Sequence, residues 1–264
     1  MRNLKGFIKT FLNTFLHLIP WRLLEEFETK IQIELGKGWG STTTEVEAKT
    51  VAELAKQKIS GDIIVFDIGA NVGDWSGSIQ KYLPNSRVIA FEPSKEAFES
   101  LTNRFIKSTS FECINLAVGK ENTETYLYAD ESASGLGSLT KRRVKHFGLS
   151  FEHRELVKVT TLDRWIENQT PNVFPNVIKM DVEGHEMDVL IGASKALKGV
   201  QIIQFEFGGG NIDTKTFFQD FWYFFESNGF EISRMTPRGL KVISQYSENF
   251  ETFKPTNYVA VRKH

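Results

Sequence analysis

The sequence has very little cysteine and almost no excess of charge of either sign. Cys113 is the one cysteine among 264 residues, which excludes a fold held by internal disulfides and fits a reducing, cytoplasmic location. A net charge of −1 gives no general attraction for nucleic acid. Internal repeats and low-complexity segments are also absent. With 41% hydrophobic and 25% charged residues, the composition is that of an ordinary soluble globular protein.

The first 44 residues are expected to form an N-terminal segment, and residues 45–264 the main domain. Apolar residues at helical spacing predict an amphipathic helix over residues 4–19, which Pro20 ends. This stretch is too short and too polar to span a bilayer, and it lacks the cleavage site of a signal peptide. Its basic face leaves two alternatives open. They are peripheral contact with the inner face of a membrane, and packing on the domain or on a second copy in a homodimer.

Two loops interrupt the regular pattern. Residues 34–44 are rich in Gly, Ser and Thr and predict a loop that closes over a ligand as a lid, with Thr44 capping the next helix. Residues 129–148 form a longer irregular stretch of the kind that is usually functional or disordered. Its basic run, residues 141–146, predicts a solvated face, and contact with a phosphorylated or acidic acceptor is the alternative.

The stretch Ile63–Asp74 organises the rest of the chain. Its first four apolar residues predict a strand that is buried on both faces, because polar alternation is missing. Gly69 and Gly73 then flank a tight turn before a helix, and glycine lets the backbone approach a ligand closely. Ligands of open α/β sheets bind at such turns, outside the carboxyl ends of the strands.

The turn differs from the dinucleotide fingerprint. Asn71 and Asp74 stand where that motif has its second and third glycines. Asp67, at the end of the strand, would also sit badly beside a pyrophosphate. A carboxylate at this place suits a ligand with a cationic group, such as the amino group of S-adenosylmethionine.

A second strand ends in an acid about twenty residues after the turn, where nucleotide folds bind a ribose. This acid, Glu92, accepts hydrogen bonds from ribose hydroxyls and does not distinguish S-adenosylmethionine from NAD. Pro93 is expected to start the next helix. Asn115 falls near the end of a third strand, over residues 110–118, where it can read an adenine amino group.

Strands and helices continue to alternate along the remaining sequence. Further strands are predicted over residues 123–128, 156–160, 176–181, 201–207, 230–235 and 258–261, and helices over residues 161–166, 187–193 and 217–227. This order predicts an α/β fold with a doubly wound, mostly parallel sheet that a terminal strand pair closes.

Five motifs in order resemble the FkbM family of S-adenosylmethionine-dependent methyltransferases, over roughly residues 63–206. They are Asp67-x-Gly69-x-Asn71-x-Gly73, Phe91-Glu92-Pro93, Asn115-x-Ala117-Val118-Gly119, Thr161-Leu162-Asp163 and the run from Ile178 to Glu186. The resemblance implies a class I methyltransferase fold of Rossmann-like type with seven strands. It also implies O-methylation of a sugar, glycan, glycolipid or related small molecule. The cofactor-binding residues that follow are Asp67, Gly69, Asn71, Gly73, Glu92, Pro93, Asn115, Leu116, Ala117 and Asp181.

Methylation of a hydroxyl group needs a general base near the cofactor. Four candidates lie at the carboxyl ends of predicted strands: Asp181, Glu183, His185 and Glu206. A histidine has the ordinary pKa best matched to neutral pH, which favours His185. Other interpretations stay open. Glu183 and Glu186 suit a helix start, His185 can support another residue, and Asp181, Glu183 and His185 offer part of a divalent metal site, which is the less favoured interpretation.

Two other classes of function compete with an O-methyltransferase. An NAD-dependent oxidoreductase shares the fold and Glu92, but the missing glycines and Asp67 disfavour it. A non-catalytic, membrane-associated module is the second alternative, and the acidic strand ends disfavour it. The Asn/Asp-Pro-Pro-aromatic signature of base amine methyltransferases is absent, which disfavours a nucleic-acid substrate.

Overall fold

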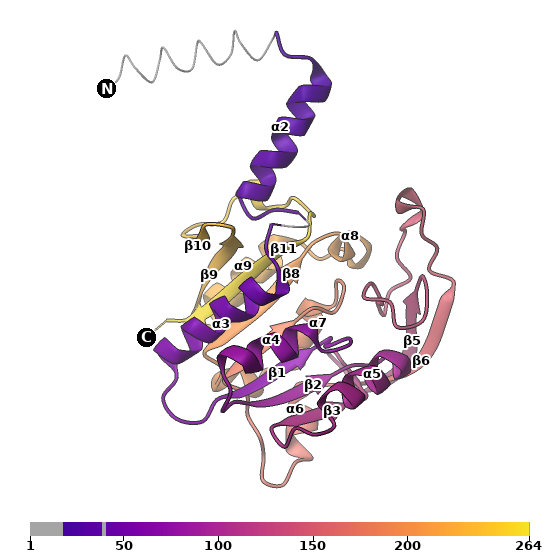
Figure 1. Cartoon of the computed structure of the whole chain (residues 1–264), viewed down its shortest axis with the longest axis vertical. Coiled ribbons are helices and arrows are strands. Elements are labelled where there is room, and N and C mark those ends of the chain that lie inside the picture. Colours follow the sequence, from indigo (N-terminus) through magenta and orange to yellow (C-terminus); the bar gives the residue numbers. More distant parts are fainter. Residues whose placement is uncertain (1–17, 39–40, 264) are drawn as a thin grey trace.

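The computed structural model describes residues 18–38 and 41–263. Its centre is an eight-stranded sheet, shown in Figure 1. The strands of this sheet are β1 (Ile64–Ile68), β2 (Arg87–Phe91), β3 (Phe111–Ile114), β7 (Val177–Met180), β8 (Ile202–Phe207), β9 (Phe230–Thr236), β10 (Gly239–Val242) and β11 (Thr256–Arg262). They lie in the order β10-β9-β11-β8-β7-β1-β2-β3.

The sheet is mostly parallel and reverses its strand order at β1. The neighbours β3, β2, β1, β7 and β8 run parallel, whereas β11 pairs antiparallel with both β8 and β9. The predicted doubly wound α/β fold is therefore confirmed. An eighth strand, β10, pairs with β9 and escapes prediction because all of its residues are exposed. Since β2 and β7 flank β1, the carboxyl ends of these three strands meet at one edge, where ligands of such sheets bind.

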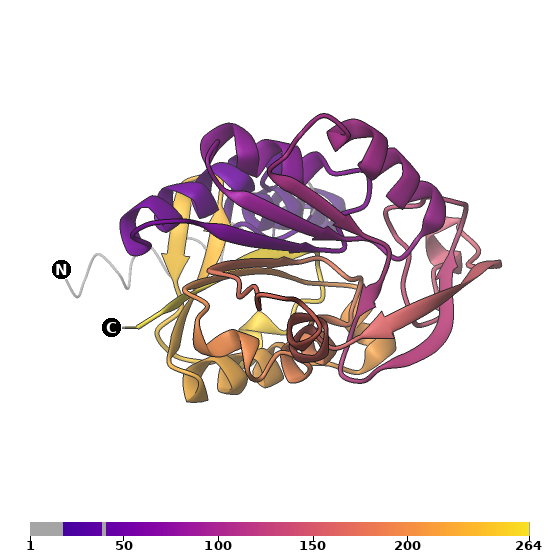
Figure 2. The same cartoon turned by 90° about the horizontal axis from the view of Figure 1, so that it is seen from below.

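Helices cover both faces of the sheet, as Figure 2 shows. One face carries α3 (Thr44–Lys58), α4 (Asp74–Tyr82) and α5 (Lys95–Phe105), and the other carries α6 (Leu162–Glu167), α7 (Glu186–Ile191) and α9 (Phe218–Ser227). Short elements are α8 (Gly210–Thr214), η1 (Lys145–Phe147), η2 (Ala196–Lys198) and η3 (Glu248–Phe250).

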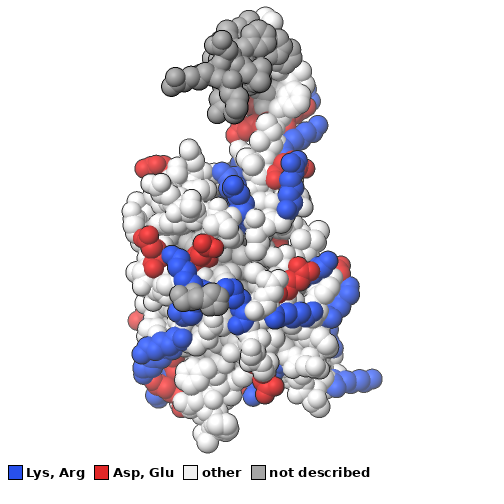
Figure 3. Space-filling model, turned by 90° about the vertical axis from the view of Figure 1, so that its left-hand side faces the viewer, with Lys and Arg blue, Asp and Glu red and all other residues white. Residues whose placement is uncertain are grey.

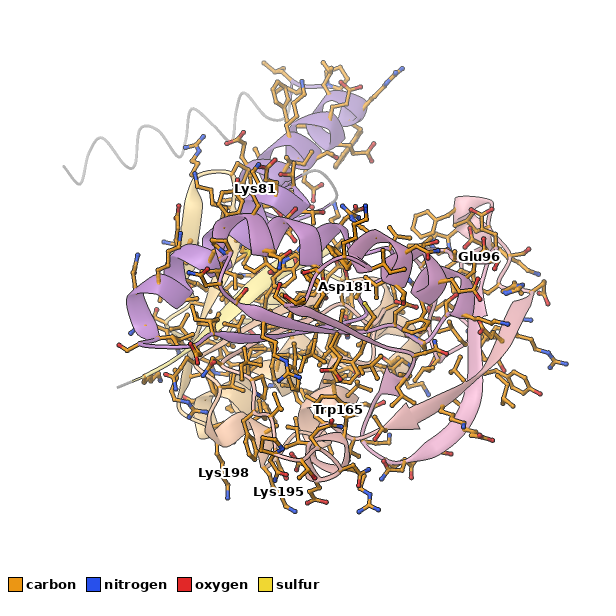
Figure 4. All side chains as sticks on the ribbon, turned by 60° about the horizontal axis from the view of Figure 1, so that its bottom comes forward. Lys81, Glu96, Trp165, Asp181, Lys195 and Lys198 are labelled. Carbon is orange, nitrogen blue, oxygen red and sulfur yellow. The ribbon has the colours of Figure 1, made fainter. Side chains whose placement is uncertain are left out.

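Alternating side chains of each strand supply the two cores. On β1, Val65 packs with the α3 and α4 side, whereas Phe66 packs on Trp165 of α6, with ring centroids 5.5 Å apart. Figure 4 shows this division, with Lys81 of α4 and Trp165 on opposite sides of the strands. The aromatic α9 buries Phe218, Phe221 and Phe225, as the sequence predicts for a core helix.

A second, three-stranded sheet corrects one prediction. It consists of β4 (Ala117–Val118), β5 (Thr123–Ala129) and β6 (His153–Thr160), in the order β4-β6-β5. The single strand expected over residues 110–118 is therefore two strands in different sheets. They are separated by a turn in which the Leu116 N–H donates to the Ile114 carbonyl over 3.0 Å. The recurring apolar residues favour one strand locally, but pairing with β6 redirects the chain.

The N-terminal segment differs from expectation in two places. The helix predicted over residues 4–19 lies almost wholly outside the described residues, and the described helix is α2 (Trp21–Glu34). Pro20 is its N-cap, because the fixed φ of proline suits a helix start, where no N–H donor is needed. The cap of α3 is Thr43, whose hydroxyl accepts from the Val46 N–H over 3.3 Å, so Thr44 is already helical.

The loop after α2 is attached to the C-terminal part of the domain. Gly38 donates its N–H to the Pro255 carbonyl over 2.8 Å, and Lys37 Nζ donates to the Asn249 carbonyl over 3.2 Å. Gly36 has φ +78°, and a Cβ there would meet the Met235 carbonyl oxygen at 2.1 Å. That this loop acts as a lid stays a prediction.

α2 itself buries none of its residues and extends away from the sheet in Figure 1. Acidic and basic side chains are interspersed over the face shown in Figure 3. Within residues 18–38 and 41–263, no helix combines the length and the apolar character needed to cross a bilayer.

Candidate active site

An open cavity lies at the carboxyl ends of β1, β2 and β7. Ligands of open α/β sheets bind at this edge. The structure brings nine predicted residues together in its wall: Gly69, Asn71, Glu92, Pro93, Leu116, Ala117, Asp181, Glu183 and His185. Apolar wall residues are Ile68, Val118, Leu127, Leu139 and Val182.

The glycine turn after β1 lines this cavity with its backbone. Gly69 has no side chain, and none would fit there. Its φ is +76°, and a Cβ there would lie 1.9 Å from the backbone oxygen of Asp181. Gly69 and Ala70 both donate their N–H groups to the Phe91 carbonyl over 3.0 Å, which ties the turn to β2. The turn thus exposes backbone to the cavity, as expected of a close approach to a ligand.

Asp67 lies beneath the turn and is fully buried. Its carboxylate accepts from Ser76 Oγ over 2.6 Å and pairs with Lys179 Nζ over 3.1 Å. Lys179 also donates to the Gly69 carbonyl over 2.9 Å, so it connects Asp67 with the turn. Burial lowers the pKa of Lys179, but Asp67 and Asp181 outweigh burial and raise it, which keeps the lysine charged.

Glu92, at the end of β2, faces the cavity with a largely buried carboxyl group. One oxygen accepts from the Asn71 N–H over 2.7 Å, and the other accepts from the Ser94 N–H over 2.8 Å. Each oxygen keeps a second lone pair for a ribose hydroxyl. Burial raises the pKa of Glu92 to about 7, against the opposing effect of the two amide donors and Lys179.

This pKa predicts a pH-dependent cofactor affinity. Ribose hydroxyls donate to the ionised carboxylate, whereas free Glu92 holds a proton below pH of about 7, so binding must expel that proton. Adenosylhomocysteine should therefore bind about five- to tenfold more weakly at pH 6 than at pH 7.5. Isothermal titration calorimetry in buffers of different ionisation enthalpy measures both the affinity and the released proton.

Glu92→Gln is the matched control, because it keeps the shape and cannot ionise. Its adenosylhomocysteine affinity should be weaker and should not change over the same pH range. A wild-type affinity that stays constant between pH 6 and 7.5 would contradict the assignment of Glu92 to the ribose.

Within the described part of the chain, the residues that line this cavity do not include Asp67, Gly73, Asn115 or Glu206. Gly73 has φ +85° and is the N-cap of α4, where a Cβ would meet the Phe105 ring at 2.6 Å. Asn115 donates its amide hydrogens to the Glu92 and Pro93 carbonyls over 2.9 and 3.0 Å. Gly73 and Asn115 therefore support chain segments beside the cavity and do not line it.

His185, at the N-cap of α7, is held by partners on both ring nitrogens. Nδ1 lies 2.8 Å from Asp188 Oδ2, and Nε2 lies 3.0 Å from Thr140 Oγ1. A carboxylate can only accept, so a neutral His185 carries its proton on Nδ1 and keeps a lone pair on Nε2. His185 and the nearby Lys120, 3.2 Å from Asp188, lower the pKa of Asp188 and keep it ionised. This arrangement suits a general base.

Glu183 sits in a strained turn before α7 and forms a buried ion pair. Its φ is +51°, which is rare for a non-glycine residue, and its Oε2 accepts from Arg142. Burial and Asp181 raise the pKa of Glu183, against the opposing effect of Arg142. Glu186 is also buried and accepts from the Val182 and Gly184 N–H groups over 3.0 and 3.3 Å, so it stabilises the turn.

The remaining candidates are Asp181 and Glu206. Asp181 is labelled in Figure 4, its side chain is 45% exposed, and it lies 3.9 Å from Lys179 Nζ. Burial, and after it the negative charge of Asp181, raises the pKa of Glu206 well above its ordinary value. Asp181, Glu183 and His185 do not converge on one point, and the described residues contain no group of three His, Cys, Asp or Glu placed to hold a metal.

The loop over residues 129–148 supplies parts of the site that sequence reasoning missed. Ser134, Gly135 and Gly137 line the cavity, Thr140 reaches His185, and Arg142 pairs with Glu183. The unusual length of the loop signals function, but nothing local shows which residues it contributes. Asp188 and Lys179 were also missed, although Lys179 stands inside a quoted motif.

Comparison with known proteins identifies the family of the chain. The family model described as "Methyltransferase FkbM domain" matches residues 67–232, more than half of the chain. Hexuronic acid methyltransferase AglP of Haloferax volcanii is 28% identical over 166 residues, which are 62% of this chain and 64% of AglP. Methyltransferase 1 of Beauveria bassiana is 26% identical over 146 residues, which are 50% of this chain and 58% of the relative. The chain thus spans less than two thirds of either relative.

Among solved structures, precorrin-6y C5,15-methyltransferase of Geobacter metallireducens is similar at a TM-score of 0.43 and 12% identity. The similar region covers 86% of this chain and 93% of that one.

Proposed function

The chain belongs to the FkbM methyltransferase family, and we propose that it transfers a methyl group from S-adenosylmethionine to a hydroxyl group of a sugar, glycan or glycolipid. The observation that carries the proposal is the placement of His185, with its basic nitrogen fixed by Asp188, in the wall of the cavity that Glu92 and the glycine turn also line. The name of the relative AglP, a hexuronic acid methyltransferase, supports a sugar acceptor.

The cavity fits the proposed cofactor. Glu92 offers acceptors for the ribose hydroxyls, and Leu116 and Ala117 offer an apolar surface for the adenine. The carboxylate of Asp181, whose side chain is 45% exposed in the same wall, offers an acceptor for the cationic amino-acid portion. Asp67 acts through Lys179, which holds the turn in place. When bound, S-adenosylmethionine supplies a methyl group already activated on a sulfonium.

The protein's part in the reaction is to position the acceptor and to remove its proton. His185 Nε2 would accept the proton of the acceptor hydroxyl as its oxygen takes the methyl group, with the sulfur–methyl bond broken and adenosylhomocysteine as the leaving group. Asp188 holds the imidazole in the required tautomer and stabilises the charge that then forms on it. In this mechanism the acceptor hydroxyl replaces Thr140 Oγ1, which contacts Nε2 here.

A thermal shift assay separates the methyltransferase from the competing oxidoreductase. A ligand that binds only the folded state raises the melting temperature, so adenosylhomocysteine should raise it and NAD should not. At about 100 times its Kd, the added stability is about 2.7 kcal/mol. A shift with NAD, or none with adenosylhomocysteine, would refute the proposed cofactor.

The acceptor can be sought in cells that make the protein and in cells that lack it. Mass spectrometry of their saccharides and glycolipids should show a methyl gain only in the first. A gain on nitrogen instead of oxygen, located by fragmentation, would contradict O-methylation.

A further inference from the structure

A second cavity, of about 410 Å³ and open to solvent, adjoins the first. The wall between them is the Arg142–Glu183 ion pair, since Glu183 lines the first cavity and Arg142 lines the second. Next to this pair the backbones of Gly184 and Gly210 lie in close contact, since a Cβ on Gly184 would lie 2.6 Å from the Gly210 backbone. Nothing in the proposed chemistry uses the second cavity, which we call the basic groove.

The basic groove has more cationic than acidic groups in its wall. Arg142, Arg143 and Lys215 line it, together with one acid, Asp213. Asp213 is already engaged, because it lies 3.8 Å from Arg142 Nε and accepts from the backbone N–H of Arg143 over 3.3 Å. The exposed side chains of Arg143 and Lys215 form no ion pair with any residue in the described ranges.

Arg142 adds a positive charge to the wall of the groove. Its side chain is 9% exposed, and its buried Nε lies 3.8 Å from Asp213 Oδ2 without a hydrogen bond to any described residue. Arg142 is already paired with Glu183 and Asp213, so Arg143 and Lys215 are the cations that face a bound anion. A guanidinium also binds carboxylate and phosphate in a fork geometry.

An aromatic surface lies beside these cations. Phe147 is 67% exposed, and the His146 ring packs against it with centroids 4.1 Å apart. Both line the groove. The C–H face of a sugar ring packs on such rings, as apolar surface does generally. Cations beside an exposed aromatic ring therefore match a sugar that carries a negative group.

We propose that the basic groove is a subsite for an anionic group, a carboxylate or a phosphate, on the saccharide acceptor. The sugar to be methylated lies in the first cavity at His185, and the anionic group lies across the Arg142–Glu183 pair. This proposal rests on the proposed sugar O-methyltransferase function. It identifies the acceptor class as anionic saccharides.

The test compares charged sugars with neutral ones of the same shape. The probes are p-nitrophenyl β-D-glucuronide against p-nitrophenyl β-D-glucoside, and glucose 1-phosphate against glucose. Saturation-transfer NMR measures their affinities for the full chain with adenosylhomocysteine at low salt. Two charge-assisted contacts should give the anionic member of a pair about tenfold tighter binding. The pair with the larger ratio tells whether carboxylate or phosphate is preferred.

The double variant Arg143→Gln/Lys215→Gln should remove most of this preference and leave the neutral sugars unchanged. Both side chains are exposed, so the fold should tolerate the change. Lys107→Gln/Lys198→Gln is the matched control, because it removes the same charge from exposed positions outside both cavities. It should keep the preference.

Three results would overturn the subsite: equal binding within both pairs, a preference that survives in Arg143→Gln/Lys215→Gln, or no binding of any probe at millimolar concentration. Adenosylhomocysteine affinity, measured on the same samples, separates the two proposals. Its absence refutes the methyltransferase function, whereas its presence with a failed sugar comparison refutes the basic groove alone.

Discussion

His185→Ala should reduce methyl transfer by about 10²–10⁴-fold and leave adenosylhomocysteine affinity nearly unchanged. The imidazole is positioned to take the proton of the acceptor, because Asp188 holds Nδ1 at 2.8 Å and leaves Nε2 basic. Removing a group that acts only in the transition state lowers the rate and spares ground-state binding. Single-turnover transfer to the identified acceptor, with affinity measured in parallel, gives both numbers.

Asp188→Asn is the second variant in this series, because an amide can donate to Nδ1 and reverse the tautomer. It should lose a large part of the same rate while keeping the ring in place. His153→Ala, on an exposed residue at the start of β6, is the matched control and should keep full activity.

Near-normal transfer by His185→Ala would mean that another group is the general base. Asp181, which lines the cavity, would then be the next candidate, and Asp181→Ala should reduce cofactor affinity as well as rate. If added Mg²⁺ or Mn²⁺ restored the His185→Ala variant, a metal-bound water would replace the imidazole as the base.

The fold was predictable where burial leaves a mark on the local sequence. Strands such as β1 and β7 are covered on both faces, so they appear in the sequence as apolar runs. A recognisable turn follows each of them. β10 could not be found this way, because its four residues are all exposed. The division of residues 110–118 into β3 and β4 depends on pairing with β6, which is a contact distant in sequence.

The candidate site was predictable to the same extent. Residues that follow a buried strand, such as Glu92 and Asp181, could be placed at one sheet edge from topology alone. The sequence could not show that Thr140 and Arg142 would return to this edge from a long loop, 45 and 41 residues from their partners. The sequence also could not show that Asp67 would pair with Lys179 beneath the turn. Asp67 and Glu92 each follow an apolar strand, so the sequence pattern places both of them beside the ligand.

Lys179→Met should lower the free energy of unfolding by about 3–5 kcal/mol, the largest expected loss of stability from one substitution in this site. Lys179 and Asp67 form a buried pair, so the variant leaves the Asp67 carboxylate without its counter-charge. Urea unfolding measured by circular dichroism gives the change. Lys81→Met is the matched control, because Lys81 pairs with Glu45 on the surface and should contribute little.

The double variant Asp67→Asn/Lys179→Met distinguishes a paired charge from a packing defect. Replacing both charges removes the unpaired carboxylate, so the double variant should be more stable than Lys179→Met alone. Lys179→Met and the double variant should both bind adenosylhomocysteine weakly, because the Gly69 carbonyl has lost the Lys179 donor that fixes the turn. If Lys179→Met and the double variant were equally unstable, the loss would come from packing. If the double variant bound adenosylhomocysteine normally, the lysine would not position the turn for the cofactor.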